Sequence, residues 1–230
     1  MSSDVGEIGE NYRSVCARIA RAAEASQLGQ VVSLIAVSKF QPIESVEALY
    51  RLGHRDFGEN YVQDLIKRAE ELKQRGCGEL RWHFIGHLQT NKVKALLPYV
   101  VSIHSVDSVK LAREISKRWT GVEALPIFVE VNIDEEPSKA GFKSGEVLAG
   151  LEEIARLPGI LVQGLMCVPS EEGDPGGAFR KLRELSLRAG ALTQGKLSMG
   201  MSSDFEVAIR EGATHVRVGS LIFGERPISP

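Results

Sequence analysis

Short apolar runs alternate with amphipathic segments along most of this 230-residue sequence, and this alternation restricts the fold more than any other feature. A run rich in Val, Ile and Leu that is bounded by turn residues is typical of a strand buried on both faces, as in parallel sheets. The strands predicted in this way are 31–40, 54–57, 82–85, 100–104, 125–133, 160–167, 196–199 and 214–218. Each is followed by a predicted helical segment, at 42–52, 60–75, 91–97, 108–119, 144–157, 178–189 and 203–211, with a short terminal turn from 220.

Eight βα units within about 200 residues match a (β/α)8 barrel, the TIM barrel, near its minimum size. The predicted fold class is therefore α/β, with a single barrel domain over residues 1–230. A doubly wound open sheet is the alternative, because alternation alone does not distinguish a closed sheet from an open one. An amphipathic helix is predicted over 2–25, so the segment 1–27 is expected to add an N-terminal helix that packs on the barrel.

Charge and cysteine content narrow the classes of partner. The chain carries 28 Lys and Arg against 30 Asp and Glu, a net charge of −2, so no bulk attraction to nucleic acid or anionic lipid is expected. No apolar stretch approaches the ~20 residues that span a bilayer, and the polar, acidic start is unlike a signal peptide. Cys16, Cys77 and Cys167 are widely spaced without a CxxC pair, which predicts free thiols in a reducing compartment. We expect a cytoplasmic protein without nucleic-acid or membrane partners.

The first predicted strand ends in a lysine. The run VVSLIAVSKF reaches Lys39, and Gln41 and Pro42 follow. In α/β folds the carboxyl ends of the strands are where ligands bind. An amine placed there is a candidate nucleophile for a carbonyl group, and a lysine that only reaches solvent is the alternative.

The exits of the last two predicted strands resemble phosphate-binding loops. The stretch SMGMSSD supplies Ser198 and Gly200, and RVGSLIFG supplies Gly219 and Ser220. In such barrels these two loops often hold a phosphate through backbone amides. Glycine allows close approach of the backbone and serine adds a hydroxyl donor, although either loop alone could be ordinary turn chemistry. The two together favour a phosphorylated ligand.

A lysine at one exit and a phosphate site at two others predict a ligand with an aldehyde and a phosphate, and pyridoxal 5'-phosphate has both. Arg217 lies two residues before Gly219 and so shares its face of the strand. It could face the pyridine nitrogen, and a surface ion pair is the alternative. Because arginine is always charged and only donates, it would keep that nitrogen unprotonated and weaken the ring as an electron sink.

A set of ordered motifs extends this interpretation over nearly the whole chain, from Leu34 to Pro227. The stretches AVSKF, FGENYVQ, WHFIGHLQTNK, VNIDEEPSKAGF, GLMCVPS, LSMGMSSDFEVAI and VRVGSLIFGERP resemble the pyridoxal-phosphate homeostasis protein family. The resemblance implies a barrel like the N-terminal domain of alanine racemase, fold-type III. The site residues that it implies are Lys39 as the Schiff-base lysine, Asn60 on the pocket wall, Ser198, Met199, Gly219 and Ser220 at the phosphate, and Arg217 at the pyridine nitrogen.

The resemblance also implies a function in intracellular pyridoxal-phosphate homeostasis, as a buffer or carrier of the cofactor without established catalysis. A chain without the domain that completes the dimer in related enzymes is expected to be a monomer, and transient contact with apo forms of pyridoxal-phosphate-dependent enzymes is expected. Ala140 and Phe142 depart from the residues that relatives often have, Ser and Ile, which leaves a secondary role of Lys139 open.

An amino-acid racemase or decarboxylase of the same barrel type is the main alternative. Such enzymes add a carboxy-terminal β domain, whereas this sequence ends at Pro230 directly after the eighth unit. Racemisation also needs a second acid or base opposite the lysine. Cys167 is a candidate by position, although a packed small residue is the expected interpretation. No metal site is expected, because His83 and His87 lie on and after a strand and do not form a helix-borne zinc pair.

Overall fold

The computed structural model describes residues 5–224, so positions 2–4 of the first predicted helix and 225–227 of the last motif lie outside the described residues. Its strands are β1 (Ser33–Val37), β2 (Asp56–Glu59), β3 (Arg81–Phe84), β4 (Val100–Val106), β5 (Leu125–Asn132), β6 (Phe142–Lys143), β7 (Ile160–Met166), β8 (Lys196–Ser198) and β9 (His215–Val218). Its α-helices are α1 (Val5–Ser26), α2 (Ile43–Arg51), α3 (Val62–Gln74), α4 (Val93–Leu96), α5 (Val109–Arg118), α6 (Val147–Ile154), α7 (Pro175–Ala189), α8 (Phe205–Arg210) and α9 (Ser220–Phe223).

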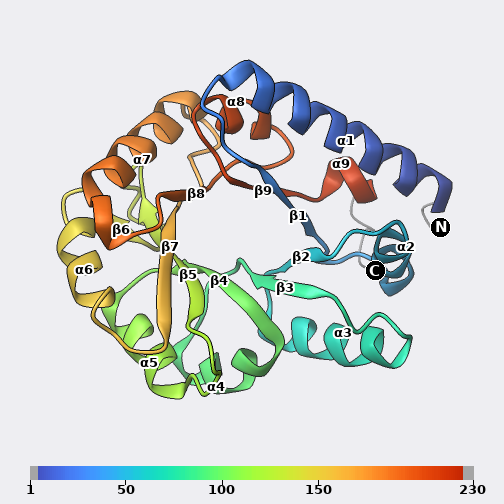
Figure 1. Ribbon diagram of the computed structural model, residues 1–230, viewed down its shortest axis with the longest axis horizontal. Helices are drawn as coiled ribbons and strands as arrows, with labels where there is room; N and C mark the ends of the chain where they lie inside the picture. Colours follow the sequence, from blue (N-terminus) through green and yellow to red (C-terminus); the bar gives the residue numbers. More distant parts are fainter. Residues whose placement is uncertain (1–4, 225–230) are drawn as a thin grey trace.

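The strands other than β6 close into a parallel barrel in the order β1, β2, β3, β4, β5, β7, β8, β9. Closure is complete because β9 pairs with β1 and β4 pairs with β5. The helices form a ring around the strands (Figure 1). The predicted (β/α)8 barrel is confirmed, and the open-sheet alternative is wrong.

The local differences from the prediction have identifiable causes. The segment predicted as one helix at 91–97 contains only a single α-turn, α4, between 3₁₀ turns at Thr90–Lys92 and Leu97–Tyr99. Pro98 lacks a backbone N–H and therefore cannot extend the helix. The two-residue strand β6 was not predicted, and it pairs with the end of β5 through Val131 and Phe142.

The N-terminal helix α1 packs beside α2, α8 and α9, and therefore spans the first and last units of the ring (Figure 1). Ile8, Val15 and Ile19 form its buried face. Arg18 makes a bidentate ion pair with the Glu206 carboxylate, in which Nε and Nη2 donate at 3.1 and 2.9 Å. The helix thus braces the two elements, α8 and α9, that follow β8 and β9.

The lumen of the barrel is filled by aromatic and imidazole rings. The His104 ring stacks on Phe128 with centroids 4.3 Å apart, and His215 meets Phe128 edge-on at 5.0 Å. Burial lowers the pKa of His215 to about 3 and holds the pKa of His104 well below its usual value, so both rings are neutral at pH 7. These packed rings occupy the middle of the barrel and leave ligand-sized space at its carboxyl end.

Two further predictions can be compared with the structure. All three cysteines are free thiols, as predicted. Within residues 5–224, no helix combines the length and the apolar composition that crossing a membrane requires.

Candidate functional site

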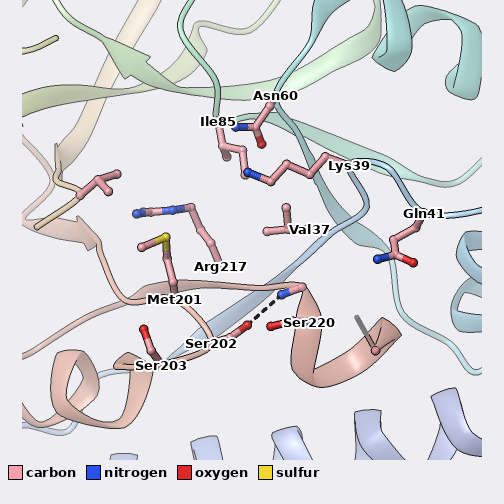
Figure 2. Close-up of a pocket in the computed structure, with 13 residues that line it drawn as sticks. Val37, Lys39, Gln41, Asn60, Ile85, Met201, Ser202, Ser203, Arg217 and Ser220 are labelled. Atoms are coloured by element: carbon pink, nitrogen blue, oxygen red, sulfur yellow. Dashed lines mark hydrogen bonds between the residues drawn. The ribbon is translucent and has the colours of Figure 1, made fainter. Parts of the chain in front are cut away.

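A cavity of about 430 Å³ opens at the carboxyl ends of β1, β2, β3 and β9. This volume is in the range of small-molecule sites. Its lining residues are Val37, Lys39, Gln41, Asn60, Ile85, Val168, Met201, Ser202, Ser203, Arg217, Gly219, Ser220 and Gly224 (Figure 2). Five of the predicted site residues, Lys39, Asn60, Arg217, Gly219 and Ser220, are thus brought together from the ends of three strands, β1, β2 and β9.

Lys39 enters the cavity from a tight turn after β1. The turn is closed by the Gln41 N–H, which donates to the Ser38 carbonyl at 3.0 Å. Phe40 in this turn has a φ of 63°, a left-handed conformation that is rare for a bulky side chain. The Lys39 side chain extends across the cavity toward Asn60 and Ile85 (Figure 2).

A buried carboxylate fixes the exits of β1 and β2 relative to each other. Glu59 Oε1 accepts the Asn60 backbone N–H at 2.9 Å, and Oε2 accepts the Ser38 hydroxyl at 3.3 Å. Oε2 also lies 3.4 Å from the Arg68 guanidinium. Burial is the main influence on this carboxyl and raises its pKa. These contacts fix the loop that carries Lys39 next to the loop that carries Asn60, on one side of the cavity.

Asn60 presents an unsatisfied acceptor at the cavity. Its Oδ1 atom is buried and has no hydrogen-bond partner among residues 5–224. Buried polar atoms in folded proteins nearly always have a partner, so such an atom on a cavity wall indicates a place for a ligand donor or a water. It lies on the same side of the cavity as Lys39 (Figure 2).

Arg217 is a buried cation on the opposite side. Its Nη1 donates to the Ser198 hydroxyl at 2.8 Å and its Nη2 donates to the Cys167 carbonyl at 3.0 Å. The residue is 5% exposed, so the surface ion-pair alternative is wrong. Burial lowers the pKa of the guanidinium, although an arginine remains charged at neutral pH.

Ser198 and Met199 do not line the cavity, in contrast to the other predicted site residues. Both are fully buried beneath it, and the Ser198 hydroxyl already contacts Arg217 and His104. Their contact with a phosphate stays a prediction. The hydroxyl-bearing residues of this loop that reach the cavity wall are Ser202 and Ser203.

The loop turns toward the cavity because of a glycine. Gly200 has a φ of 93°, and a Cβ there would lie 2.6 Å from the Ala208 Cβ. The following Met201 N–H donates to Asp204 Oδ1 at 2.6 Å. Ser202 Oγ then accepts the Gly219 N–H at 3.3 Å (Figure 2), which ties the β8 loop to the β9 loop.

Comparison with known proteins identifies the family of this site. The alanine racemase N-terminal domain model matches residues 7–227. The pyridoxal phosphate homeostasis protein of Aquifex aeolicus is 44% identical over 200 residues, which cover 84% of this chain and 86% of that protein. The chain belongs to the pyridoxal phosphate homeostasis protein family. This confirms the resemblance of the ordered motifs.

Solved structures agree with this membership of the pyridoxal phosphate homeostasis family. PipY of Synechococcus elongatus PCC7942, with PLP bound, has a TM-score of 0.80 at 32% identity and covers 94% of this chain and 100% of that chain. Alanine racemase from Corynebacterium glutamicum has a TM-score of 0.69 at 16% identity, and the match covers 98% of this chain and 62% of that chain. The second likeness shows that the two proteins share the barrel fold.

The structure shows the surroundings of two residues, Cys167 and Lys139, whose roles the sequence left open. Cys167 is completely buried, and burial raises the pKa of its thiol to about 12, so it stays protonated at neutral pH. Lys139 forms an ion pair with Glu136, and its Nζ donates to the Val168 carbonyl at 3.3 Å. Lys139 therefore supports a loop that contributes Val168 to the cavity wall.

Sequence reasoning missed the other side chains of this wall, including Val37, Ile85, Met201 and Ser202. The available signal was the stretch SMGMSSD, which places six polar or sulfur-bearing side chains at or after one strand exit. Spacing alone did not indicate which of them would face the cavity. Within the described part of the chain, no group of three or more His, Cys, Asp or Glu residues could hold a metal ion.

Proposed function

We propose that this protein binds pyridoxal 5'-phosphate, with its aldehyde carbon bonded to Lys39, and acts in intracellular homeostasis of this cofactor. One observation carries the proposal: an amine, a buried guanidinium and three serine hydroxyls line the same cavity of about 430 Å³. A cofactor of this size with one carbonyl and one phosphate matches that set of groups. The relatives named for pyridoxal phosphate homeostasis and PipY with PLP bound support it.

The residues of the site fit the cofactor group by group. Lys39 supplies the amine, and the buried Oδ1 of Asn60 supplies an unused acceptor beside it. Ser202, Ser203 and Ser220 supply hydroxyl donors, and Gly219 allows the backbone of the last loop to come close. The cofactor supplies a reactive aldehyde and an electron-withdrawing ring when it is bound.

Arg217 sets the electrostatic character of the proposed ring site. A fixed positive charge that can only donate hydrogen bonds disfavours protonation of a ring nitrogen facing it. This limits how well the ring can accept electrons from a substrate carbanion. The arrangement is therefore better suited to holding the cofactor than to deep carbanion chemistry.

The absence of turnover is part of the proposal. Among the described residues that line the cavity, Lys39 and Arg217 are the ones with titratable side chains. Cys167, the candidate second acid or base, holds its proton and is buried. Since racemisation needs two opposed acid–base groups, the racemase or decarboxylase alternative is not favoured.

We also propose that the chain works as one cytoplasmic, monomeric barrel domain that meets apo forms of pyridoxal-phosphate-dependent enzymes transiently. The near-neutral net charge of −2 and the free thiols are consistent with this setting. The proposal concerns delivery or storage of the cofactor, and the partners would be recognised at the mouth of the barrel, where the cavity opens.

Absorbance spectroscopy followed by borohydride reduction and peptide mapping tests the proposal. The wild-type protein is expected to take up pyridoxal phosphate and to carry the reduced adduct on Lys39, whereas Lys39→Ala is expected to retain none after gel filtration. Lys92→Ala is the matched control, because Lys92 lies near the barrel mouth but does not line the cavity. An adduct on another lysine, or equal retention by Lys39→Ala, would contradict the assignment. Racemisation of alanine at enzyme-like rates would contradict the absence of turnover.

A further inference from the structure

A chain of hydrogen bonds runs through the barrel lumen and ends at Arg217. At its far end, Asp56 Oδ1 lies 3.0 Å from His83 Nε2. His83 Nδ1 lies 3.1 Å from His104 Nε2, and His104 Nδ1 lies 2.8 Å from Ser198 Oγ. Ser198 Oγ accepts from Arg217 Nη1 at 2.8 Å. The chain connects the amino-terminal end of β2 with a residue of the cavity wall.

The two ends of the chain fix the direction of every hydrogen within it. Arg217 can only donate, so Ser198 Oγ is its acceptor and gives its own hydrogen to His104 Nδ1. A neutral His104 then carries its hydrogen on Nε2 and donates to His83 Nδ1.

Reasoning from the other end gives the same result. The Asp56 carboxylate, whose pKa is lowered to about 2 with His83 and Arg81 as its stabilising partners against burial, accepts from His83 Nε2. Reversing the chain would leave the Ser198 hydroxyl hydrogen without an acceptor among the contacts of this buried residue.

We propose that His104 and Ser198 are positioning residues, which hold the Arg217 guanidinium at the cavity through hydrogen bonds that all point from Arg217 toward Asp56. This role differs from the phosphate contact predicted for Ser198, because Ser198 acts on the cavity only through Arg217. The inference about ligand affinity rests on the proposed function, whereas the direction of the chain does not.

The packing around the chain keeps it in one arrangement. His104 is fully buried, is stacked on Phe128, and has His83 and His215 edge-on at 5.2 and 5.8 Å. A ring held on all sides cannot flip to exchange its two nitrogens without opening the lumen. The guanidinium of Arg217 is anchored a second time by the Cys167 carbonyl.

The direction of the chain can be measured without any ligand. Nitrogen-15 NMR of the histidine-labelled protein at pH 7 reports which ring nitrogen carries hydrogen, and the His104→Phe variant assigns the His104 signals. Both His83 and His104 are expected to carry hydrogen on Nε2 and to accept a hydrogen bond at Nδ1. A hydrogen on Nδ1 of either ring would overturn the proposed direction.

A double-mutant cycle tests the positioning role. Ser198→Ala is expected to weaken binding of pyridoxal phosphate about tenfold, the effect of losing one hydrogen bond to a charged group. In an Arg217→Ala background the same change is expected to alter affinity less than about twofold, because the guanidinium that donates to the Ser198 hydroxyl is then absent. Equal losses in both backgrounds would mean that Ser198 contacts the ligand directly, and the proposal would be wrong.

Ser102→Ala is the matched control. Ser102 is also a buried serine on a barrel strand, and its hydroxyl has no hydrogen-bond partner in the described structure. Its removal is expected to leave both affinity and the Arg217 Nε–H NMR signal unchanged, whereas Ser198→Ala should shift or broaden that signal. If the wild type takes up no pyridoxal phosphate, the proposed function fails, and the histidine and Arg217 signals still decide the chain. An unchanged Arg217 signal in folded Ser198→Ala would overturn the positioning role.

Discussion

The lumen of the barrel and the cavity above it are built from the same strands, yet the hydrogen-bond chain in the lumen and the wall of the cavity differ in how their polar groups are paired. In the lumen, His83, His104 and Ser198 find their partners in each other. In the cavity, the Asn60 Oδ1 atom has no partner among residues 5–224. Buried polar groups that satisfy one another stabilise and orient a structure, whereas those left open await a ligand or water. Residues with paired polar groups, such as His104 and Ser198, therefore support the site, whereas Asn60, with an unpaired acceptor, is placed to contact a ligand.

The largest expected effect is the loss of a lumen ring. Phe128→Ala should lower the free energy of unfolding by about 3–5 kcal/mol, because it removes a fully enclosed ring against which two histidines pack. Urea denaturation of wild type and variant measures this change. A loss below about 1 kcal/mol would indicate that the lumen is not the packed support described above.

Acid should destabilise the protein through the buried histidines of the lumen. His104 and His215 have folded-state pKa values below that of an unfolded histidine, so the unfolded chain binds more protons as the pH falls below about 6.5. Both rings should therefore cost stability between pH 7 and pH 5, and His215, with its pKa of about 3, should account for about 2 kcal/mol of the loss. Denaturation curves at each pH measure the loss.

Glu130 opposes this acid loss and allows it to be dissected. Burial, followed by the charge of Asp107, raises the pKa of this carboxyl to about 7. The folded protein therefore binds this proton first as the pH falls from 7 to 4.5, which stabilises it by about 2 kcal/mol at pH 5. Glu130→Gln should thus lose about 2 kcal/mol more stability than the wild type over the same interval. Identical slopes in the two proteins would contradict the assignment of Glu130.

The smallest effects are expected from the hydroxyls of the cavity wall. Ser202→Ala and Ser220→Ala should each weaken retention of pyridoxal phosphate by about fivefold, the effect of one hydrogen bond near 1 kcal/mol. Their thermal unfolding should change little, in contrast to the lumen variants. Affinity is measured by absorbance titration. Ser116→Ala is the control, because Ser116 does not line the cavity and its hydroxyl donates to the Pro158 carbonyl at 2.6 Å. Equal binding by both variants and the control would remove these hydroxyls from the site.

The sequence predicted those features that follow from period and order. Eight alternating units determine the barrel, and the two-residue period of a strand correctly placed Arg217 on the face of Gly219. The loop after β8 was less predictable because its direction depends on the left-handed Gly200 and on the contact of Met201 with Asp204. These tertiary details decide that Ser202 reaches the wall while Ser198 lies beneath it. The lumen chain was also missed, because its members come from five strands whose side chains meet only after closure.

The helix α1 has a consequence for how the site is supported. Asn11 of this helix reaches the Ile222 carbonyl in α9 at 3.4 Å, while Arg18 contacts Glu206 in α8. The 22-residue helix α1 therefore contacts, from the outer side of the barrel, both helices that follow the loops carrying Ser202 and Ser220. One helix on the outer surface therefore supports the two loops that bring serine hydroxyls to the cavity, and through its packing beside α2 it also reaches the unit that carries Lys39.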